Sequence, residues 1–339
     1  MHSMKHISTC CKSLILLCLL LCLTGCSEPK ITKQIFAMDT YMEMTAYGKN
    51  AETALQDVIS TINSYAKELD PEVESSAVYA LNHANGNAVT LDPVIVDMLT
   101  TAKQIWQQTE GALDLTVYPV VKAWGFIDSA HTVPSAAQLQ QLQTVPCFDA
   151  VDIDSHTVTM PAGSEISFGA VAKGAMAERS KQILKEYGIE SAFLSLGGNV
   201  QTVGVKPDGS LWRIGVQDPN NLSGYLGIVS IGELAAVTSG SYQRYFEQDG
   251  KLYHHIIDPA TAAPAESGLV SVTILCDSGT MADCLSTAMF IMGEEAALAY
   301  RSTYGGFDMI LVTDDHRVIV AGDLQFEEAA EGYIYQYQP

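Results

Sequence analysis

Basic residues are scarce in this sequence, and no two cysteines have the CxxC spacing. Lysine and arginine together number 18 against 39 acidic residues, which gives a formal net charge of −21. A surface this acidic argues against binding to nucleic acid or to anionic lipid headgroups, because both are themselves negative. None of the eight cysteines belongs to a CxxC pair, so a zinc site and a thioredoxin-like redox motif are both disfavoured.

A long apolar segment is also missing. The run from Ser13 to Leu23 has eleven residues, which is too short to cross a bilayer as a helix. With Lys5 and Lys12 before it, the run is typical of a secretory signal. It ends in Leu23-Thr24-Gly25-Cys26, which resembles a bacterial lipoprotein cleavage site. The alternative is an N-terminal membrane anchor that stays uncleaved.

Cleavage at this site predicts three segments. Residues 1–25 form the signal peptide, 26–33 a short tether that begins at the lipidated Cys26, and 34–339 the functional domain. Loss of two lysines changes the net charge from −21 to −23. We therefore expect a membrane-anchored lipoprotein outside the cytoplasm, on the periplasmic side of an inner membrane or at the cell surface. Spacing alone does not define a disulfide among Cys147, Cys276 and Cys284.

The domain shows no internal repeat, no low-complexity linker and no clear internal boundary. Apolar periodicity and capping residues predict helices over 50–69, 93–111, 135–142, 171–187, 280–292 and 294–302. Extended patterns and turn signals predict strands over 31–47, 113–121, 165–168, 192–196, 200–205, 212–217, 226–231, 234–238, 269–276, 308–312 and 317–321, with hairpins at 149–160 and at Asp249-Gly250. This mixture predicts a single large α+β domain with mixed, largely antiparallel sheets and packed helices.

Two glycine-containing segments sit at the ends of predicted strands. Gly169–Gly174 lies at a strand-to-helix junction, where free amides and Lys173 could face an anion. It is neither a Walker loop nor a GxGxxG motif, and the alternative is an ordinary tight turn. Gly197-Gly198 allows either close approach of a ligand to the backbone or a sharp bend.

Asp283 and Thr287 are four residues apart on a predicted helix, so their oxygens lie on one face, one turn apart. Oxygen ligands of this kind suit a hard cation such as magnesium, which often accompanies a phosphorylated ligand. The alternative is structural: Asp283 would favour the helix dipole, and Thr287 would bond back to the preceding turn.

His254 and His255 are adjacent in an extended segment, so they point to opposite faces and at most one enters a given site. His255 could act as a general base toward a hydroxyl nucleophile, since the ordinary pKa of histidine is about 6.5. The alternative for a single histidine is a structural hydrogen bond.

An ordered series of segments resembles the ApbE family of FAD:protein FMN transferases. The segments are Met38-Asp39-Thr40, ALDLTV from Ala112, WGF from Trp124, SFGAVAKGAMAERS from Ser167, SLGGNV from Ser195, TSGSYQRYF from Thr238, DGKLYHHIIDPATAAP from Asp249, LVSVTILC from Leu269 and ADCLSTAMFIMG from Ala282. Each segment alone is weakly diagnostic, but their order along the whole mature chain is specific. The lipoprotein signal fits, since many members are tethered to membranes.

The resemblance implies a T-fold-related domain that splits FAD at its pyrophosphate. FMN is joined through a phosphoester to a threonine or serine hydroxyl of a target flavoprotein, typically a subunit of a membrane redox complex, and AMP leaves. It implies Mg²⁺ held by Asp283, Thr287 and the carbonyl of Ala170, with Ser286 close by. His255 would activate the acceptor hydroxyl. The positions expected to contact FAD are Met38, Ala112, Leu113, Asp114, Ser167, Lys173 and Ile257.

Three positions depart from the family pattern. Asp39 replaces a glycine, Ser167 stands where an aspartate is common, and Ala262-Ala263-Pro264 replaces part of a Thr-Gly-x-Pro run. Two other functions stay open at this point. Water could replace the acceptor hydroxyl, which would make the protein an FAD pyrophosphatase, or the protein could be a flavin-binding lipoprotein without catalysis.

Overall fold

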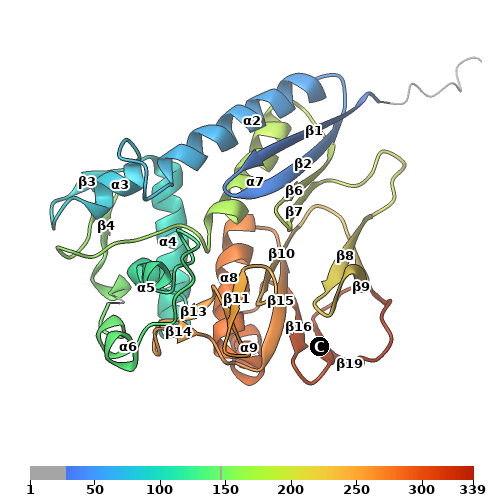
Figure 1. The fold of residues 1–339 in the computed structure, drawn as a ribbon. Helices are drawn as coiled ribbons and strands as arrows, with labels where there is room; N and C mark the ends of the chain where they lie inside the picture. Colours follow the sequence, from blue (N-terminus) through green and yellow to red (C-terminus); the bar gives the residue numbers. More distant parts are fainter. Residues whose placement is uncertain (1–27, 146) are drawn as a thin grey trace, which may run out of the picture.

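A nine-stranded sheet forms the centre of the protein (Figure 1). The structure, a computed structural model, describes residues 28–145 and 147–339, so the predicted signal peptide and Cys26 lie outside the described residues. Every neighbouring pair in the sheet is antiparallel except the last, β17 with β19, which confirms the predicted mixed, largely antiparallel arrangement. In spatial order the strands are β1 (Lys30–Ala37), β2 (Thr40–Tyr47), β6 (Ser191–Leu196), β7 (Asn199–Val203), β10 (Ala235–Gly240), β15 (Leu269–Cys276), β16 (Asp308–Thr313), β17 (Arg317–Ala321) and β19 (Ile334–Gln338).

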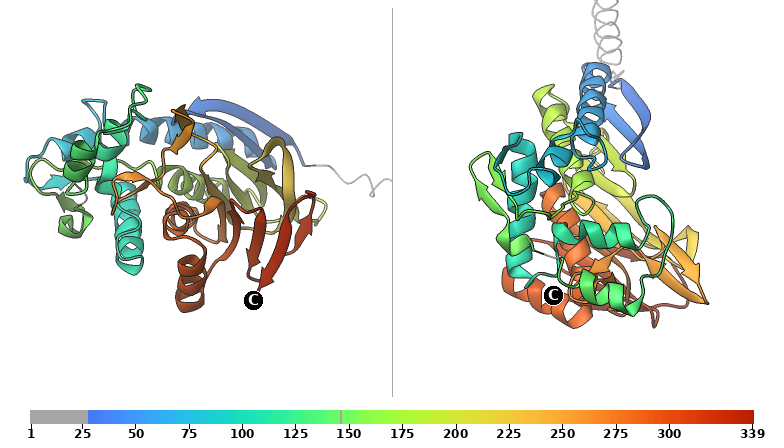
Figure 2. Two further views of the ribbon diagram at one scale, coloured as in Figure 1. Left: turned by 60° about the horizontal axis from the view of Figure 1, so that its bottom comes forward. Right: turned by 60° about the vertical axis from the view of Figure 1, so that its left-hand side comes forward.

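Other elements pack on both faces of the sheet, as Figures 1 and 2 show. Helices α2 (Ala51–Glu68), α7 (Ala172–Glu186) and α8 (Gly279–Met292) pack on one face, and α4 (Pro93–Gln108) and α9 (Glu294–Tyr304) pack against α8. A three-stranded sheet of β8 (Trp212–Asp218), β9 (Asn221–Ile231) and β18 (Phe326–Glu328) packs on the other face. Ile274 and Leu275 in β15 therefore enter different cores, since successive side chains of a strand point to opposite faces.

A third group of elements packs beside the helical layer. It contains α3 (Ala77–Asn82), the 3₁₀ turns η1 (Leu115–Val117) and η2 (Phe148–Ala150), α5 (Tyr118–Ala123), α6 (Ala136–Leu142), the small sheet of β3 (Val89–Thr90), β5 (Thr157–Thr159) and β4 (Asp152–Asp154), and the hairpins β11 (Tyr245–Gln248) with β12 (Lys251–His254) and β13 (Ile257–Asp258) with β14 (Ala263–Pro264). A small core that includes Trp124, Phe126, Phe246 and Ile257 joins α5 to the two hairpins.

The first turns of α7 and α8 cross in close contact, and each caps the other. An added Cβ on Gly174 would lie 2.1 Å from the carbonyl oxygen of Gly279, so only glycine permits this separation. Asp283 of α8 accepts the Gly174 N–H of α7 at 2.8 Å, and Glu178 of α7 accepts the Thr280 N–H of α8 at 3.1 Å. Both helix starts thereby gain a carboxylate partner for an otherwise unpaired amide.

Three predicted segments differ from the structure. Residues 31–47 form two strands joined by a tight turn rather than one strand. Residues 113–121 are mostly helical, because Asp114 caps η1 and Pro119 fits the first turn of α5. Residues 165–168 form no strand, because the Ile166 N–H bonds to the side chain of Asn82 instead of to a neighbouring strand.

Among the described residues no helix has the length and apolarity needed to cross a membrane. Cys147, Cys276 and Cys284 are all free thiols.

Candidate active site

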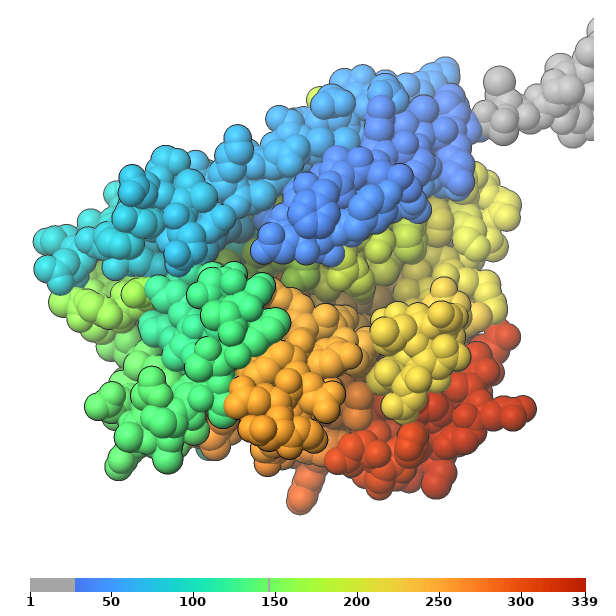
Figure 3. Space-filling model, in the orientation of Figure 1, coloured from blue at the N-terminus to red at the C-terminus, as the bar shows by residue number. Residues whose placement is uncertain are grey.

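A cavity of about 640 Å³ opens where the central sheet, the α7–α8 crossing and the third group of elements meet. Figure 3 shows the recess between the blue β1–β2 hairpin, the green segment around α5, the orange β11–β12 region and the yellow β8–β9 hairpin. The structure brings every predicted site residue of the domain to this cavity: Met38, Ala112, Leu113, Asp114, Ser167, Ala170, Lys173, His255, Ile257, Asp283 and Thr287. Their individual roles stay predictions.

One carboxylate oxygen of Asp283 accepts a hydrogen bond, and the other is free to bind a ligand. Its Oδ2 accepts the Gly174 N–H at 2.8 Å, and no donor among the described residues bonds to Oδ1. The side chain is 5% exposed, so a free carboxylate oxygen is held in a fixed direction at the cavity wall. The structural and the ligand interpretations of Asp283 are therefore compatible, because each uses a different oxygen.

Further oxygens lie beside Asp283. The carbonyl of Ala170, just before the N-cap of α7, accepts no hydrogen bond from the described residues. The Ser239 hydroxyl lies 3.3 Å from that of Thr287 and 2.8 Å from that of Ser286. A carboxylate, a carbonyl and a hydroxyl form the oxygen set that Mg²⁺ prefers. No cluster of three or more His, Cys, Asp or Glu occurs in the described residues, so a metal here would need oxygens from a ligand or water as well.

Lys173 supplies positive charge at the start of α7. Its side chain lines the cavity and forms no ion pair with an acid of the described residues. Its backbone N–H also has no acceptor there, whereas the neighbouring Ala172 N–H bonds to Phe168. A helix N-terminus with a free amide and a free ammonium group suits an anion such as a phosphate.

His255 is positioned by the backbone of Arg244. The carbonyl of Arg244 accepts the His255 N–H at 3.1 Å and lies 3.2 Å from Nδ1. Because a carbonyl only accepts, the ring proton is on Nδ1, and Nε2 carries a free lone pair. Burial, followed by the positive charges of Arg244 and Lys173, lowers the pKa of His255 to about 3. The imidazole is therefore neutral at physiological pH, with the lone pair of Nε2 unprotonated.

His254 has a different role, as the alternation predicted. Its Nε2 lies 3.1 Å from the Ala265 carbonyl, its Nδ1 accepts the Ile256 N–H, and its ring packs on Phe290. Burial lowers its pKa as well. Both ring nitrogens are occupied inside the core, so His254 is structural.

The carboxylate of Asp114 is hydrogen-bonded to its own loop and to η2. It accepts the N–H and the hydroxyl of Thr116 at 2.7 and 2.5 Å, and the Phe148 N–H at 3.4 Å. Burial raises its pKa. These bonds fix the loop that contributes Ala112 and Leu113 to the cavity wall.

Two hairpin turns form the rim beside this loop. Ala37 pairs with Thr40 and Leu196 with Asn199, so each loop has two residues. Both residues of each loop have positive φ, including Met38 at 50° and Asp39 at 57°. Such turns favour glycine, which explains the glycine that Asp39 replaces in the family pattern. Gly197-Gly198 makes a sharp turn and also lines the cavity, so both of its interpretations apply.

Three further polar residues of the cavity were not predicted. Asn199 is 2% exposed, and its side-chain NH₂ group has no partner among the described residues. Ser239 joins the hydroxyl network, and Arg244 holds His255. Ser239 and Arg244 lie in the TSGSYQRYF segment, and Asn199 in SLGGNV, so the quoted blocks contained them. Their roles depend on contacts between distant segments that spacing does not give.

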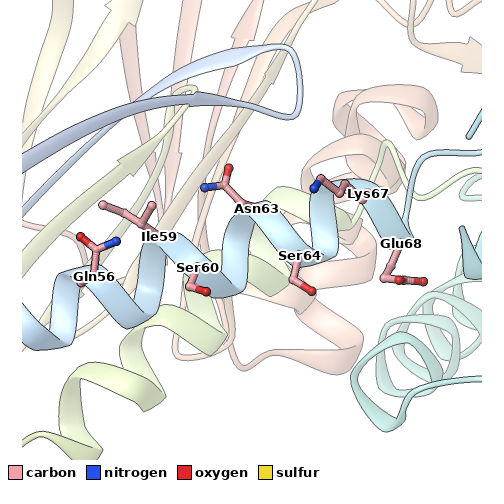
Figure 4. Close-up of a pocket in the computed structure, with 7 residues that line it drawn as sticks. All are labelled: Gln56, Ile59, Ser60, Asn63, Ser64, Lys67 and Glu68. Atoms are coloured by element: carbon pink, nitrogen blue, oxygen red, sulfur yellow. The ribbon is translucent and has the colours of Figure 1, made fainter. Parts of the chain in front are cut away.

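A second hollow of about 450 Å³ lies along the outer side of α2 (Figure 4). All of its lining residues come from that one helix: Gln56, Ile59, Ser60, Asn63, Ser64, Lys67 and Glu68. It brings together no convergent catalytic groups, and the cavity around Asp283 is the candidate active site.

The fold and the cavity define a class of enzyme that binds a phosphorylated ligand and activates a hydroxyl. The free amide and ammonium group of Lys173, the free carboxylate oxygen of Asp283 and the neutral ring of His255 face one space. The chain belongs to the ApbE family, whose model matches residues 38–311. This confirms the family to which the ordered segments pointed.

Relatives and solved structures agree with this assignment. The chain is 32% identical to the FAD:protein FMN transferase of Klebsiella pneumoniae, over 83% of this chain and 90% of the relative. It is 30% identical to that of Vibrio cholerae, over 89% and 94%. The crystal structure of the ApbE protein from Thermotoga maritima superposes with a TM-score of 0.79 at 28% identity, covering 88% of this chain and 97% of that one.

Proposed function

We propose that this protein transfers FMN from FAD to a hydroxyl of a target protein and releases AMP. The proposal rests on one observation: Lys173 at the start of α7, the free Asp283 oxygen and the neutral His255 all face the same cavity. The relatives named FAD:protein FMN transferase support the same reaction. Threonine or serine is the proposed acceptor residue, because the reaction needs an aliphatic hydroxyl that a histidine can deprotonate.

The chain's own residues supply the proton transfer and the phosphate binding. His255 Nε2 takes the proton of the acceptor hydroxyl, whose oxygen bonds to the phosphorus of the FMN half. The bridging P–O bond breaks, and its electron pair stays with the oxygen of AMP. The amide and ammonium groups of Lys173 hold the pyrophosphate in place and offset its negative charge.

We propose Mg²⁺ as the metal, held by Asp283, Thr287 and the Ala170 carbonyl. The free Asp283 oxygen and the unpartnered carbonyl fit this ion. When bound, the ion would neutralise charge on the pyrophosphate and on the departing phosphate.

We also propose that the protein is a lipoprotein anchored outside the cytoplasm through Cys26. The support is the short apolar run and the small residues before that cysteine. The proposed target is a redox flavoprotein that carries its flavin on a threonine.

One assay separates the three candidate functions. The protein is incubated with FAD, Mg²⁺ and a flavin-free acceptor subunit, and AMP, free FMN and protein-bound flavin are measured. AMP with labelled acceptor supports transfer. AMP with free FMN would mean hydrolysis by water, and intact FAD would mean binding alone.

Two variants test the assigned residues. Asp283→Asn keeps the oxygen that accepts the Gly174 N–H but removes the charge, so AMP release should fall by about 100-fold or more. His255→Gln should slow transfer by about 100-fold or more while FAD affinity changes little. Asp323→Asn, an exposed site outside the cavity, is the matched control for Asp283→Asn and should behave as the wild type. Full AMP release by Asp283→Asn would refute the metal assignment, and equal loss of binding and transfer in His255→Gln would refute the base.

A further inference from the structure

Four large apolar side chains stand exposed around the mouth of the cavity. Phe36 is 72% exposed, Tyr41 56%, Leu222 60% and Ile127 40%. Leu222 and Ile127 line the cavity itself, and Phe36 and Tyr41 flank the turn from Met38 to Thr40 that lines it. We call these four residues the mouth patch.

The two aromatic residues form a pair on the outer face of the β1–β2 hairpin. Phe36 lies directly opposite Tyr41 in the strand register, so both side chains point to the same face. Farther from the tip this face is polar: Gln34 bonds to Glu43 at 2.6 Å, and Thr32 to Thr45 at 2.9 Å. The apolar surface of the hairpin is thus concentrated beside the cavity.

The mouth patch comes from three parts of the chain that are distant in sequence. They are the β1–β2 hairpin, the segment after α5 and the start of β9, which border the same recess in Figure 3. Exposed aromatic and aliphatic groups gathered around one opening are typical of a surface that binds another molecule.

The proposed reaction determines what must cross this mouth. With FAD in the cavity, the acceptor hydroxyl has to reach Nε2 of His255 from outside, so the protein that carries it must cover the rim. We propose that the mouth patch is the docking surface for the acceptor protein, which meets it with apolar side chains around the reactive hydroxyl. This inference rests on the proposed function and adds where the partner binds.

A lipid surface could also bind these apolar side chains, but the position at which the described chain begins β1 argues against this occupant. The described chain enters β1 at Lys30, six residues before Phe36, which is about 20 Å along an extended strand. A lipid on Cys26 would therefore hold the membrane near the opposite end of the hairpin from the mouth patch.

The test compares a folded acceptor with a short peptide. The probes are a flavin-free redox subunit that carries its FMN on a threonine, and a peptide of about ten residues around that threonine. Phe36→Ser and Tyr41→Ser, which lie outside the cavity lining, should each raise the KM for the subunit by about tenfold, the size expected for a residue central to an interface. The kcat, the KM for the peptide and the Kd for FAD should stay at wild-type values.

Matched controls come from exposed residues elsewhere. Tyr304 is 50% exposed at the end of α9, and Ile334 is 62% exposed on β19, at the opposite edge of the sheet from β1. Tyr304→Ser and Ile334→Ser should leave the KM for the subunit unchanged, because neither residue lies near the mouth.

Several outcomes overturn the inference. An unchanged KM for the subunit in the mouth-patch variants would overturn it. An equal rise in the KM for the peptide would also overturn it, because it would indicate a change inside the cavity. If the Cys26→Ser chain binds phosphatidylcholine vesicles, and adding Phe36→Ser abolishes that binding while the KM for the subunit is unchanged, the patch would be assigned to lipid. Wild-type protein that yields free FMN and no labelled subunit would overturn the proposed function and the docking surface together.

Discussion

His255 should remain a base well below the pH at which an ordinary histidine is protonated. Burial and the charges of Arg244 and Lys173 lower its pKa to about 3, against about 6.5 in the unfolded chain. The kcat/KM for transfer, which reports the free enzyme, should therefore stay level from about pH 8 to about pH 5. Its contribution to folding stability is complete above about pH 6.5 and is lost as the pH falls toward 3.

The neighbouring arginine provides the control for this prediction. Arg244→Gln removes one of the charges that face His255, so the acid limb of the profile should move to higher pH. If the acid limb of the wild-type kcat/KM profile lies near pH 6.5 and Arg244→Gln does not shift it, then these charges and burial do not hold His255 neutral.

Asn199 should bind the ligand with its buried side-chain NH₂ group. That group is fully buried at the cavity and has no partner among the described residues, which costs stability in the free protein. Asn199→Leu should therefore weaken FAD binding by about tenfold, the value of one hydrogen bond, without lowering the free energy of unfolding. Flavin fluorescence titration and urea unfolding measure the two effects. A loss of stability with unchanged FAD affinity would mean that Asn199 is structural.

At the scale of secondary-structure elements, the crossing of α7 and α8 fixes the site. In Gly174→Ala the new Cβ would lie 2.1 Å from the Gly279 oxygen and 2.6 Å from Cβ of Asp283. The helices must separate, which should lower the free energy of unfolding by about 3 kcal/mol. Asp283 would also lose its position, so FAD-dependent AMP release should fall. Urea unfolding and an AMP assay measure these changes.

Gly232→Ala is the control for this crossing. Gly232 has no positive φ, and its added Cβ meets nothing within 4 Å, so the free energy of unfolding should change by less than about 0.5 kcal/mol. Equal stability of Gly174→Ala and the wild type would show that the close helix contact is not needed.

Elements with a complete local signal could be predicted from the sequence. The helix from Pro93 begins at the predicted cap, since Asp92 accepts the Val94 N–H at 2.9 Å, and the hairpin at Asp249-Gly250 forms as expected. The segment 165–168 could not be predicted, because its partner Asn82 is 84 residues away from Ile166. The first hairpin was missed because Met38-Asp39 adopts two positive φ angles without a glycine.

The residues that line the candidate site could be named from the sequence mainly because of the family resemblance. Composition and spacing indicated only a hard-cation helix face and a single histidine base. The family resemblance supplied the set of residues that the structure places around one cavity. Neither the spacing of residues nor the family resemblance could show which oxygen of Asp283 is free or which amide of the cavity lacks a partner. Both depend on contacts between distant segments.

For the whole molecule, the cavity joins segments from residue 38 to residue 291, so its ligands should stabilise the entire fold. FAD with Mg²⁺ at about 100 times its Kd should add about 2.7 kcal/mol to the free energy of unfolding, a rise in Tm on the order of 5 °C.

The two ligands should act together rather than separately. In the proposed site the protein would offer a single carboxylate to the ion, at Asp283, and the pyrophosphate would supply the other anionic oxygens. Mg²⁺ alone should therefore shift Tm very little, and the joint shift should exceed the sum of the separate shifts, as reciprocal coupling requires. Asp283→Asn should keep the shift caused by FAD alone and lose the increment caused by Mg²⁺. Thermal unfolding monitored by tryptophan fluorescence measures all four conditions, and additive shifts in the wild type would contradict a shared site.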